Sequence, residues 1–127
     1  MPFVVAYAFA ATRAQKRAFV RVVTGAVCAA YGVEAATVAV YIFEIGDDDY
    51  GHAGETGDAA PEKRVFIQVH ALPRPVRRKR ALVDGITRAV STSLDVPGEI
   101  VAVYIQDSPP GNVAHGGVLL ADAGEDP

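Results

Sequence analysis

The chain of 127 residues contains one five-residue segment twice, and this repeat limits the possible folds more than any other feature. Val38–Ile42 reads VAVYI, and Val101–Ile105 reads the same at an offset of 63 residues. Residues that also agree at this offset are Lys16 and Lys79, Ala26 and Ala89, His52 and His115, and Gly54 and Gly117. Identity in register with a matching helical pattern indicates a duplicated unit.

The first half is predicted to fold as a strand, a helix and a second strand. Residues 3–9 form an apolar run that is typical of a strand. Thr12 and Gln15 have the spacing of a helix capping box, and the apolar residues that follow at i, i+3 and i+4 predict a helix. Gly32 stands where a helix would end, and residues 37–45 form the second strand.

The second half repeats this order, with strands at 65–72 and 100–106. Between them we expect a helix that opens at Pro75 and stops at residues 96–98. Two strands joined by a helix are parallel, and the crossover is right-handed. The predicted fold is therefore α/β (α+β): two fused βαβ units that form a four-stranded sheet with two helices on one face.

The length of the chain suits a single domain, residues 1–127. Its two repeats span about 2–45 and 64–106, with a connecting loop at about 46–63 and a C-terminal segment at about 107–127. The strands are apolar on both faces, so the second face of the sheet needs a cover that this chain does not supply. We therefore expect a closed oligomer.

Composition excludes several classes of protein. The net charge of −3 does not favour nucleic acid or anionic membranes as partners, and the apolar start lacks the basic leader of a signal peptide. The single cysteine, Cys28, fits a reducing cytoplasm. The spacing of His52 and His115 offers no metal-ligand cluster. We expect a cytoplasmic protein without a metal, a membrane or a nucleic-acid partner.

Pro2 directly follows the initiator Met1 and opens the first apolar run. If Met1 is removed, the nitrogen of Pro2 becomes a secondary amine. A free α-amino group titrates at about 7.7–8.0, and burial in an apolar pocket would lower that pKa. Such an amine could act as a general acid/base, but only in a chain from which Met1 has been removed.

Five basic residues crowd one segment: Arg74, Arg77, Arg78, Lys79 and Arg80. Arg74 lies between Pro73 and Pro75, so its backbone is stiff. Arginine suits the binding of a carboxylate because its planar fork offers two parallel hydrogen bonds. The whole segment can also be interpreted as a solvated helix face or a phosphate-contacting surface.

The amino-terminal proline, the βαβ unit of about sixty residues and a glycine-containing loop after the second strand resemble the tautomerase superfamily, whose prototype is 4-oxalocrotonate tautomerase. The resemblance is closest at residues 68–72, 93–97 and 111–117. Two fused units are similar to the branch that includes cis-3-chloroacrylic acid dehalogenase and malonate semialdehyde decarboxylase. The resemblance implies a homotrimer that needs no cofactor.

The resemblance also implies roles for individual residues. Pro2 is similar in position to the catalytic proline of the family. Arg74 and Arg77 keep the spacing with which the dehalogenase holds its substrate carboxylate. Tyr104 matches a functional tyrosine in the last strand of that enzyme, and Tyr50 matches a wall-forming aromatic residue of the prototype. Phe3, Tyr50 and Val113 could help to line the apolar pocket.

Some positions depart from the family. Val27 stands where the dehalogenase has a histidine, and His115 stands where it has a water-activating glutamate. Ala39 and Ala102 replace the strand arginine of the prototype. The first half has Ala11 and Ala14 at the positions of Arg74 and Arg77, and the second half has Val65 at the position of Pro2. One half would therefore supply the base and the other the anion-binding arginine.

The function that this pattern favours is a cofactor-free tautomerase in which Pro2 acts on a small 2-oxo or enol carboxylate anchored by arginine. A hydratase, hydrolytic dehalogenase or decarboxylase acting on a three-carbon unsaturated or oxo acid is the first alternative, with His115 as a candidate base. A non-catalytic trimer with a vestigial site is the second alternative.

Overall fold

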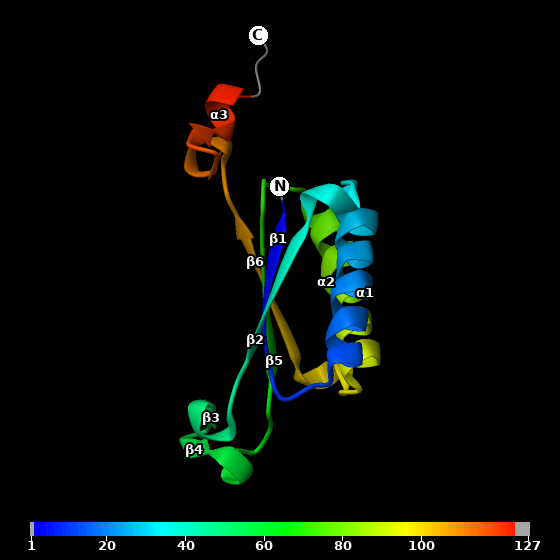
Figure 1. The fold of residues 1–127 in the computed structure, drawn as a ribbon, viewed down its shortest axis with the longest axis vertical. Coiled ribbons are helices and arrows are strands. Elements are labelled where there is room, and N and C mark those ends of the chain that lie inside the picture. The colour runs from blue at the N-terminus through cyan, green and yellow to red at the C-terminus, as the bar shows by residue number, and fades with distance from the viewer. Residues whose placement is uncertain (1, 124–127) are drawn as a thin grey trace.

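The computed structural model describes residues 2–123, and its elements follow the repeated order (Figure 1). The first unit contains β1 (Phe3–Ala8), α1 (Arg13–Tyr31) and β2 (Ala39–Glu44). The second contains β5 (Val65–Ala71), α2 (Val76–Leu94) and β6 (Val101–Asp107). Each unit is followed by a two-stranded hairpin: β3 (Gly51–His52) with β4 (Glu55–Thr56), and β7 (Ala114–His115) with β8 (Val118–Leu119). The short helix α3 (Leu120–Ala123) follows β8.

The main sheet has the strand order β2-β1-β5-β6, and both long helices cover one of its faces (Figure 1). β1 and β2 are parallel, as are β5 and β6, whereas the two units join through the antiparallel pair β1 and β5. The predicted four-stranded sheet with two helices on one face is confirmed. The antiparallel join means that the two units run in opposite directions through the sheet.

Local signals in the sequence define the ends of α1. The backbone nitrogen of Gln15 donates to Oγ1 of Thr12, and the backbone nitrogen of Thr12 donates to Oε1 of Gln15, which completes the expected capping box. Gly32 ends the helix in the left-handed region at φ 67°, where glycine meets no Cβ penalty. In α2, Pro75 precedes the first helical residue, and Asp95 ends the helix at φ 56°.

The hydrophobic core lies between the helices and the sheet. Alternate residues of β1 and β5 face the helices and are buried, because side chains of a strand point to opposite faces in turn. The buried core residues are Val4, Ala6, Ala8, Phe19, Val23, Val27, Tyr31, Val65, Ile67, Val69, Ala71, Leu82, Ile86 and Val90. Burial of each large aliphatic side chain contributes about 1.5–3 kcal/mol.

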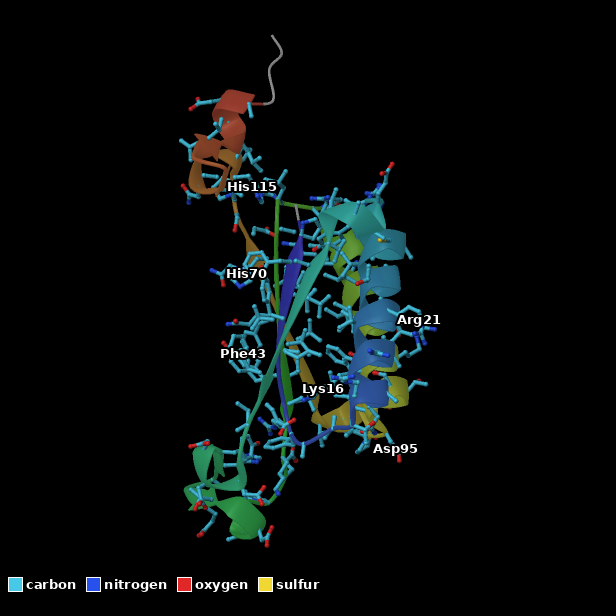
Figure 2. The ribbon with its side chains drawn as sticks, viewed as in Figure 1. Lys16, Arg21, Phe43, His70, Asp95 and His115 are labelled. Atoms are coloured by element: carbon cyan, nitrogen blue, oxygen red, sulfur yellow. The ribbon has the colours of Figure 1, made fainter. Side chains whose placement is uncertain are left out.

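The opposite face of the sheet is aromatic and uncovered in the single chain. Tyr41, Phe43 and Tyr104 are 53%, 51% and 67% exposed. Figure 2 shows Phe43 and His70 on the side of the sheet away from the helices. Large exposed apolar patches mark interaction surfaces. Within residues 2–123, neither long helix has an apolar stretch of the length needed to cross a bilayer.

Candidate active site

The antiparallel join gives the sheet two related ends. Phe3 pairs with His70, so the start of β1 lies beside the end of β5, and Pro2 is close to the segment that leads to Arg74. At the other end, Tyr7 pairs with Phe66, so the end of β1 lies beside the start of β5. The residues that correspond to Pro2 and Arg74 at that second end are Val65 and Ala11.

Pro2 is less than 2% exposed, and its carbonyl accepts a 3.4 Å hydrogen bond from the backbone nitrogen of Ala39. The next residue, Phe3, stacks on the imidazole of His70 with 4.5 Å between ring centroids. Pro2 is therefore in an apolar, desolvated environment. Such an environment disfavours the charged form of an amine.

Arg74 precedes α2, and two contacts orient its side chain. Its Nη1 donates to the carbonyl of Leu72 at 2.8 Å, and its Cζ lies 4.7 Å from the ring centroid of Tyr31. No carboxylate within residues 2–123 lies in ion-pair distance of Arg74. Its charge is therefore available to an anionic ligand.

Lys79, in the first turn of α2, has a different environment from that of Arg74. Its Nζ lies 2.7 Å from Oδ2 of Asp107, the last residue of β6. The same ion pair occurs at the other end of the sheet, between Lys16 and Glu44 at 2.9 Å. The two pairs match at the 63-residue offset, so we assign them to the duplicated fold rather than to one site.

Tyr31, the last residue of α1, is 2% exposed and packs in the core. Its hydroxyl has no hydrogen-bond partner among residues 2–123. Burial raises the pKa of the Tyr31 hydroxyl; nearby Lys79 and Arg74 oppose this shift, and Asp107 adds to it. The side chain therefore stays neutral at ordinary pH. Tyr31 is not among the site residues expected from the sequence, and the one signal for it there is that Leu94 occupies the equivalent position of the second unit.

Two other residues from the sequence analysis lie towards the Pro2 end. Arg77 is exposed in the first turn of α2 and forms no ion pair within the described chain. His115 is exposed in the β7–β8 hairpin, which lies at the same end of the sheet as the amino terminus (Figures 1 and 2). Within residues 2–123, neither side chain forms a hydrogen bond or an ion pair with Arg74 or Pro2, so the single chain does not bring these residues together into one site.

A small apolar cavity of about 30 Å³ adjoins Phe3 at this end. Its lining residues are Phe3, His70, Ala71, Leu72, Ser108, Val113 and Leu120. Phe3 and Val113 line this cavity, whereas Pro2 and Tyr50 are not among its lining residues.

Tyr50 lies at the opposite end of the sheet in the same chain. Its hydroxyl accepts a 2.9 Å hydrogen bond from the backbone nitrogen of Arg64, and its ring meets Phe9 edge-on at 5.1 Å. Tyr104 lies on the uncovered face, where its ring meets Phe66 edge-on at 5.3 Å. A contact of either residue with Pro2 would require a second copy of the chain.

Three positions where the sequence departs from the family pattern, Val27, Ala39 and Ala102, lie in the core or in the sheet. Val27 is fully buried between α1 and the sheet, so it packs in the core. Ala39 pairs with Phe3 and Ala102 pairs with Phe66, at matching places in the two units. Neither position supplies a positive charge, which leaves the segment around Arg74 as the source of cations near Pro2.

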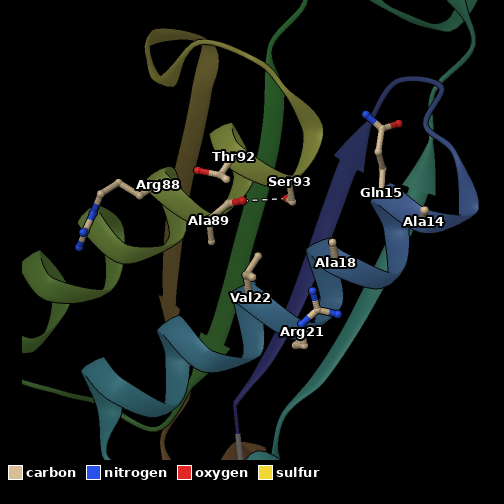
Figure 3. Close-up of a pocket in the computed structure, with 9 residues that line it drawn as sticks. All are labelled: Ala14, Gln15, Ala18, Arg21, Val22, Arg88, Ala89, Thr92 and Ser93. Atoms are coloured by element: carbon tan, nitrogen blue, oxygen red, sulfur yellow. Dashed lines mark hydrogen bonds between the residues drawn. The ribbon is translucent and has the colours of Figure 1, made fainter.

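A larger open groove of about 600 Å³ lies elsewhere, between α1 and α2 (Figure 3). Its lining residues are Ala14, Gln15, Ala18, Arg21, Val22, Arg88, Ala89, Thr92 and Ser93. The hydroxyl of Ser93 donates to the carbonyl of Ala89, and Arg88 pairs with Asp84. The lining residues include no carboxylate, histidine, cysteine or lysine, so we do not regard the groove as an active site.

The part of the chain that the structure describes contains no group of three or more His, Cys, Asp or Glu side chains that could hold a metal ion.

Comparison with known proteins agrees with this arrangement. The sequence model of the tautomerase enzyme family matches residues 2–59 and 65–123, one match for each unit. The chain belongs to the tautomerase family. A comparison with curated protein sequences found no match.

Solved structures give the same fold. A fused 4-OT named Q0, described as a wild-type symmetric trimer, is 28% identical with a TM-score of 0.86, and the alignment covers 97% of this chain and 99% of that one. A native fused 4-OT is 24% identical with a TM-score of 0.90 and the same coverage. N1, a member of the cis-3-chloroacrylic acid dehalogenase family, is 24% identical with a TM-score of 0.79 over 96% of this chain and 85% of that one.

Proposed function

We propose that this chain, after removal of Met1, is a cofactor-free tautomerase in which Pro2 is the general acid/base. The substrate is a small 2-oxo or enol carboxylate, and Arg74 binds its carboxylate. The observation that carries this proposal is the asymmetry of the two sheet ends. One end combines Pro2 with an unpaired arginine, whereas the equivalent end has Val65 and Ala11.

The reaction needs one group that moves a proton. The neutral amine of Pro2 accepts the hydroxyl proton of the enol, the carbonyl forms, and the same group then delivers a proton to the carbon that was part of the double bond. A lowered amine pKa keeps a neutral fraction at working pH. Arg74 stabilises the negative charge that develops on the enolate and carboxylate oxygens, and such preorganised charge is usually the largest catalytic term.

We also propose that the chain assembles as a homotrimer in the cytoplasm. The uncovered aromatic face with Phe43 and Tyr104 supports the assembly, because a soluble chain does not leave such a surface in water. The trimeric description of the similar fused 4-OT Q0 adds support. A trimer would also bring residues such as Tyr104 and Tyr50 within reach of a neighbouring chain's Pro2. The single cysteine supports the location.

Replacement of Pro2 by Ala tests the proposal, with removal of Met1 verified by mass spectrometry in both proteins. We expect kcat for the ketonisation of phenylenolpyruvate to fall by about 10²-fold or more, the usual contribution of a positioned acid/base. The matched control is Val65→Ala at the equivalent position, which should leave kcat within about twofold of the parent. An unchanged rate in Pro2→Ala would contradict the proposal and favour a vestigial site.

A second candidate is the addition of water to a three-carbon unsaturated acid, with hydrolytic dehalogenation or decarboxylation as related reactions. The position of the exposed His115 at the Pro2 end favours it, since an imidazole can activate water. In that reaction Pro2 acts as an acid and must be protonated. The two candidates therefore require opposite charge states of one amine.

A further inference from the structure

Because the βαβ unit is duplicated, each residue at the Pro2 end of the sheet can be compared with the residue at the same repeat position at the other end. The Lys–Asp or Lys–Glu ion pair is present at both ends, as Lys79 with Asp107 and Lys16 with Glu44. Other positions differ. The Pro2 end has Tyr31 and Arg74, and the corresponding residues at the other end are Leu94 and Ala11. The aromatic residue and the arginine therefore occur together at one end and are absent together at the other.

Tyr31 and Arg74 are in direct contact. The Cζ of Arg74 lies over the ring of Tyr31 at 4.7 Å from its centroid, within the range of a cation–π interaction. The carbonyl of Leu72 accepts a hydrogen bond from Nη1 of Arg74 at 2.8 Å. The ring and the carbonyl together fix the guanidinium, and its remaining N–H groups have no acidic partner within residues 2–123.

The ring is itself buried at the end of a helix. Tyr31 is 2% exposed and is the last residue of α1, directly before the left-handed turn at Gly32. Arginine loses considerable side-chain entropy when a ligand immobilises it. A guanidinium that already lies against a rigid ring loses less on binding, so more of the interaction energy appears as affinity.

We propose that Tyr31 is a positioning residue for Arg74: its buried ring holds the guanidinium in the orientation that binds the substrate carboxylate. The inference rests on the proposed function. It gives Tyr31, in the first unit, a role in substrate binding that it performs through Arg74, in the second unit. Tyr31 does not touch the substrate in this account, and its effect passes through Arg74.

The roles of the ring and of the hydroxyl of Tyr31 can be tested separately. It is buried without a hydrogen-bond partner among residues 2–123, with Lys79, Asp107 and Arg74 as the charged groups near it. The positioning role needs the ring but not the hydroxyl. Tyr31→Phe keeps the ring, whereas Tyr31→Leu introduces the residue that the other end uses.

Steady-state kinetics with a carboxylate substrate tests the inference. We expect Arg74→Ala to raise KM by roughly 10- to 100-fold, because a charge-assisted hydrogen bond is lost. Tyr31→Leu should raise KM by about fivefold with little change in kcat, as expected for the loss of a cation–π contact of about 1 kcal/mol. Tyr31→Phe should restore KM to within about twofold of the parent. The double variant Tyr31→Leu/Arg74→Ala should resemble Arg74→Ala alone.

Leu94→Ala is the control for lost packing at the end of a helix, and it should leave KM unchanged. If Tyr31→Leu does not fold, Tyr31→Met, whose flexible side chain fills irregular gaps in a core and has no π face, takes its place. If Arg74→Ala raises KM but Tyr31→Leu or Tyr31→Met leaves it unchanged, the positioning role of Tyr31 is wrong and the proposed function is unaffected. Additive effects in the double variant also overturn it. An unchanged KM in Arg74→Ala overturns the anchoring role of Arg74, and the inference with it.

Discussion

The ring of Phe3 stacks on the imidazole of His70, with 4.5 Å between centroids and 3° between planes. Phe3 directly follows Pro2, whereas His70 belongs to the first strand of the second unit. The second unit therefore fixes the residue next to the proposed base, in addition to supplying Arg74. At the other end of the sheet the equivalent residues, Tyr7 and Phe66, also stack, at 5.7 Å.

His70→Ala removes this stack. We expect the free energy of unfolding to fall by about 1 kcal/mol, as for other aromatic pairs, and kcat to fall because Pro2 is less well positioned. Urea unfolding at fixed protein concentration and steady-state kinetics measure the two effects. Tyr7→Ala disrupts the equivalent stack and should reduce stability without a comparable loss of kcat. Equal losses of kcat in both variants would indicate a general structural effect.

The pH dependence of kcat/KM distinguishes the two proposed reactions. If Pro2 is a base, the rate rises with pH through the pKa of its amine. Pro2 is less than 2% exposed with Met1 attached, and if its nitrogen is equally shielded once Met1 is removed, that pKa should lie below the ordinary value of about 7.7–8.0. If Pro2 must donate a proton, the rate falls through the same pKa. A rate that decreases across this range would favour addition of water over tautomerisation.

Phe43→Glu should weaken self-association. Phe43 is 51% exposed in the single chain, and burial of its ring in an assembly would contribute about 1.5–3 kcal/mol per chain. Loss of that burial and the cost of burying a carboxylate should weaken association by at least about tenfold. Sedimentation velocity at several concentrations measures this change. Val20→Glu, at an exposed position on α1, is the control. A trimer that persists unchanged in Phe43→Glu would show that this face is not the interface.

The stability of the chain should fall at alkaline pH in part because of Tyr31. Burial raises the pKa of its hydroxyl above 10.0, so between the unfolded and folded values the native state binds more protons than the unfolded state. Stability from this group is therefore fully present below about pH 10 and is lost as pH rises through the folded pKa. Tyr31→Phe lacks this titration. Urea unfolding from pH 8 to 11 should give a shallower decline for Tyr31→Phe, and parallel declines would count against the assignment.

Much of the fold could be predicted from local patterns. The repeat, the helical spacing, the capping box at Thr12 and the stop at Gly32 are set by neighbouring residues, so they are readable without the structure. The unit βαβ then follows from chain connectivity. These features predicted both helices and all four strands of the main sheet within about two residues.

The composition of the site could be predicted only in part. The repeat showed that neither Pro2 nor Arg74 has a counterpart in the other half. The contact of Arg74 with Tyr31 depends on which strands of the two units pair, and the sequence pattern does not specify that choice. The same pairing puts Tyr50 at the far end of the sheet in one chain. Residues that meet through tertiary pairing leave no local signal.

The fusion of the two βαβ units into one chain also has a covalent consequence. A polypeptide has one α-amino group, whatever the number of repeats fused into it. The nitrogen at position 65 is an amide whichever residue is there, so even Val65→Pro could not create a second titrating amine. Fusion therefore halves the number of α-amino groups per pair of units and leaves the Val65 end without one.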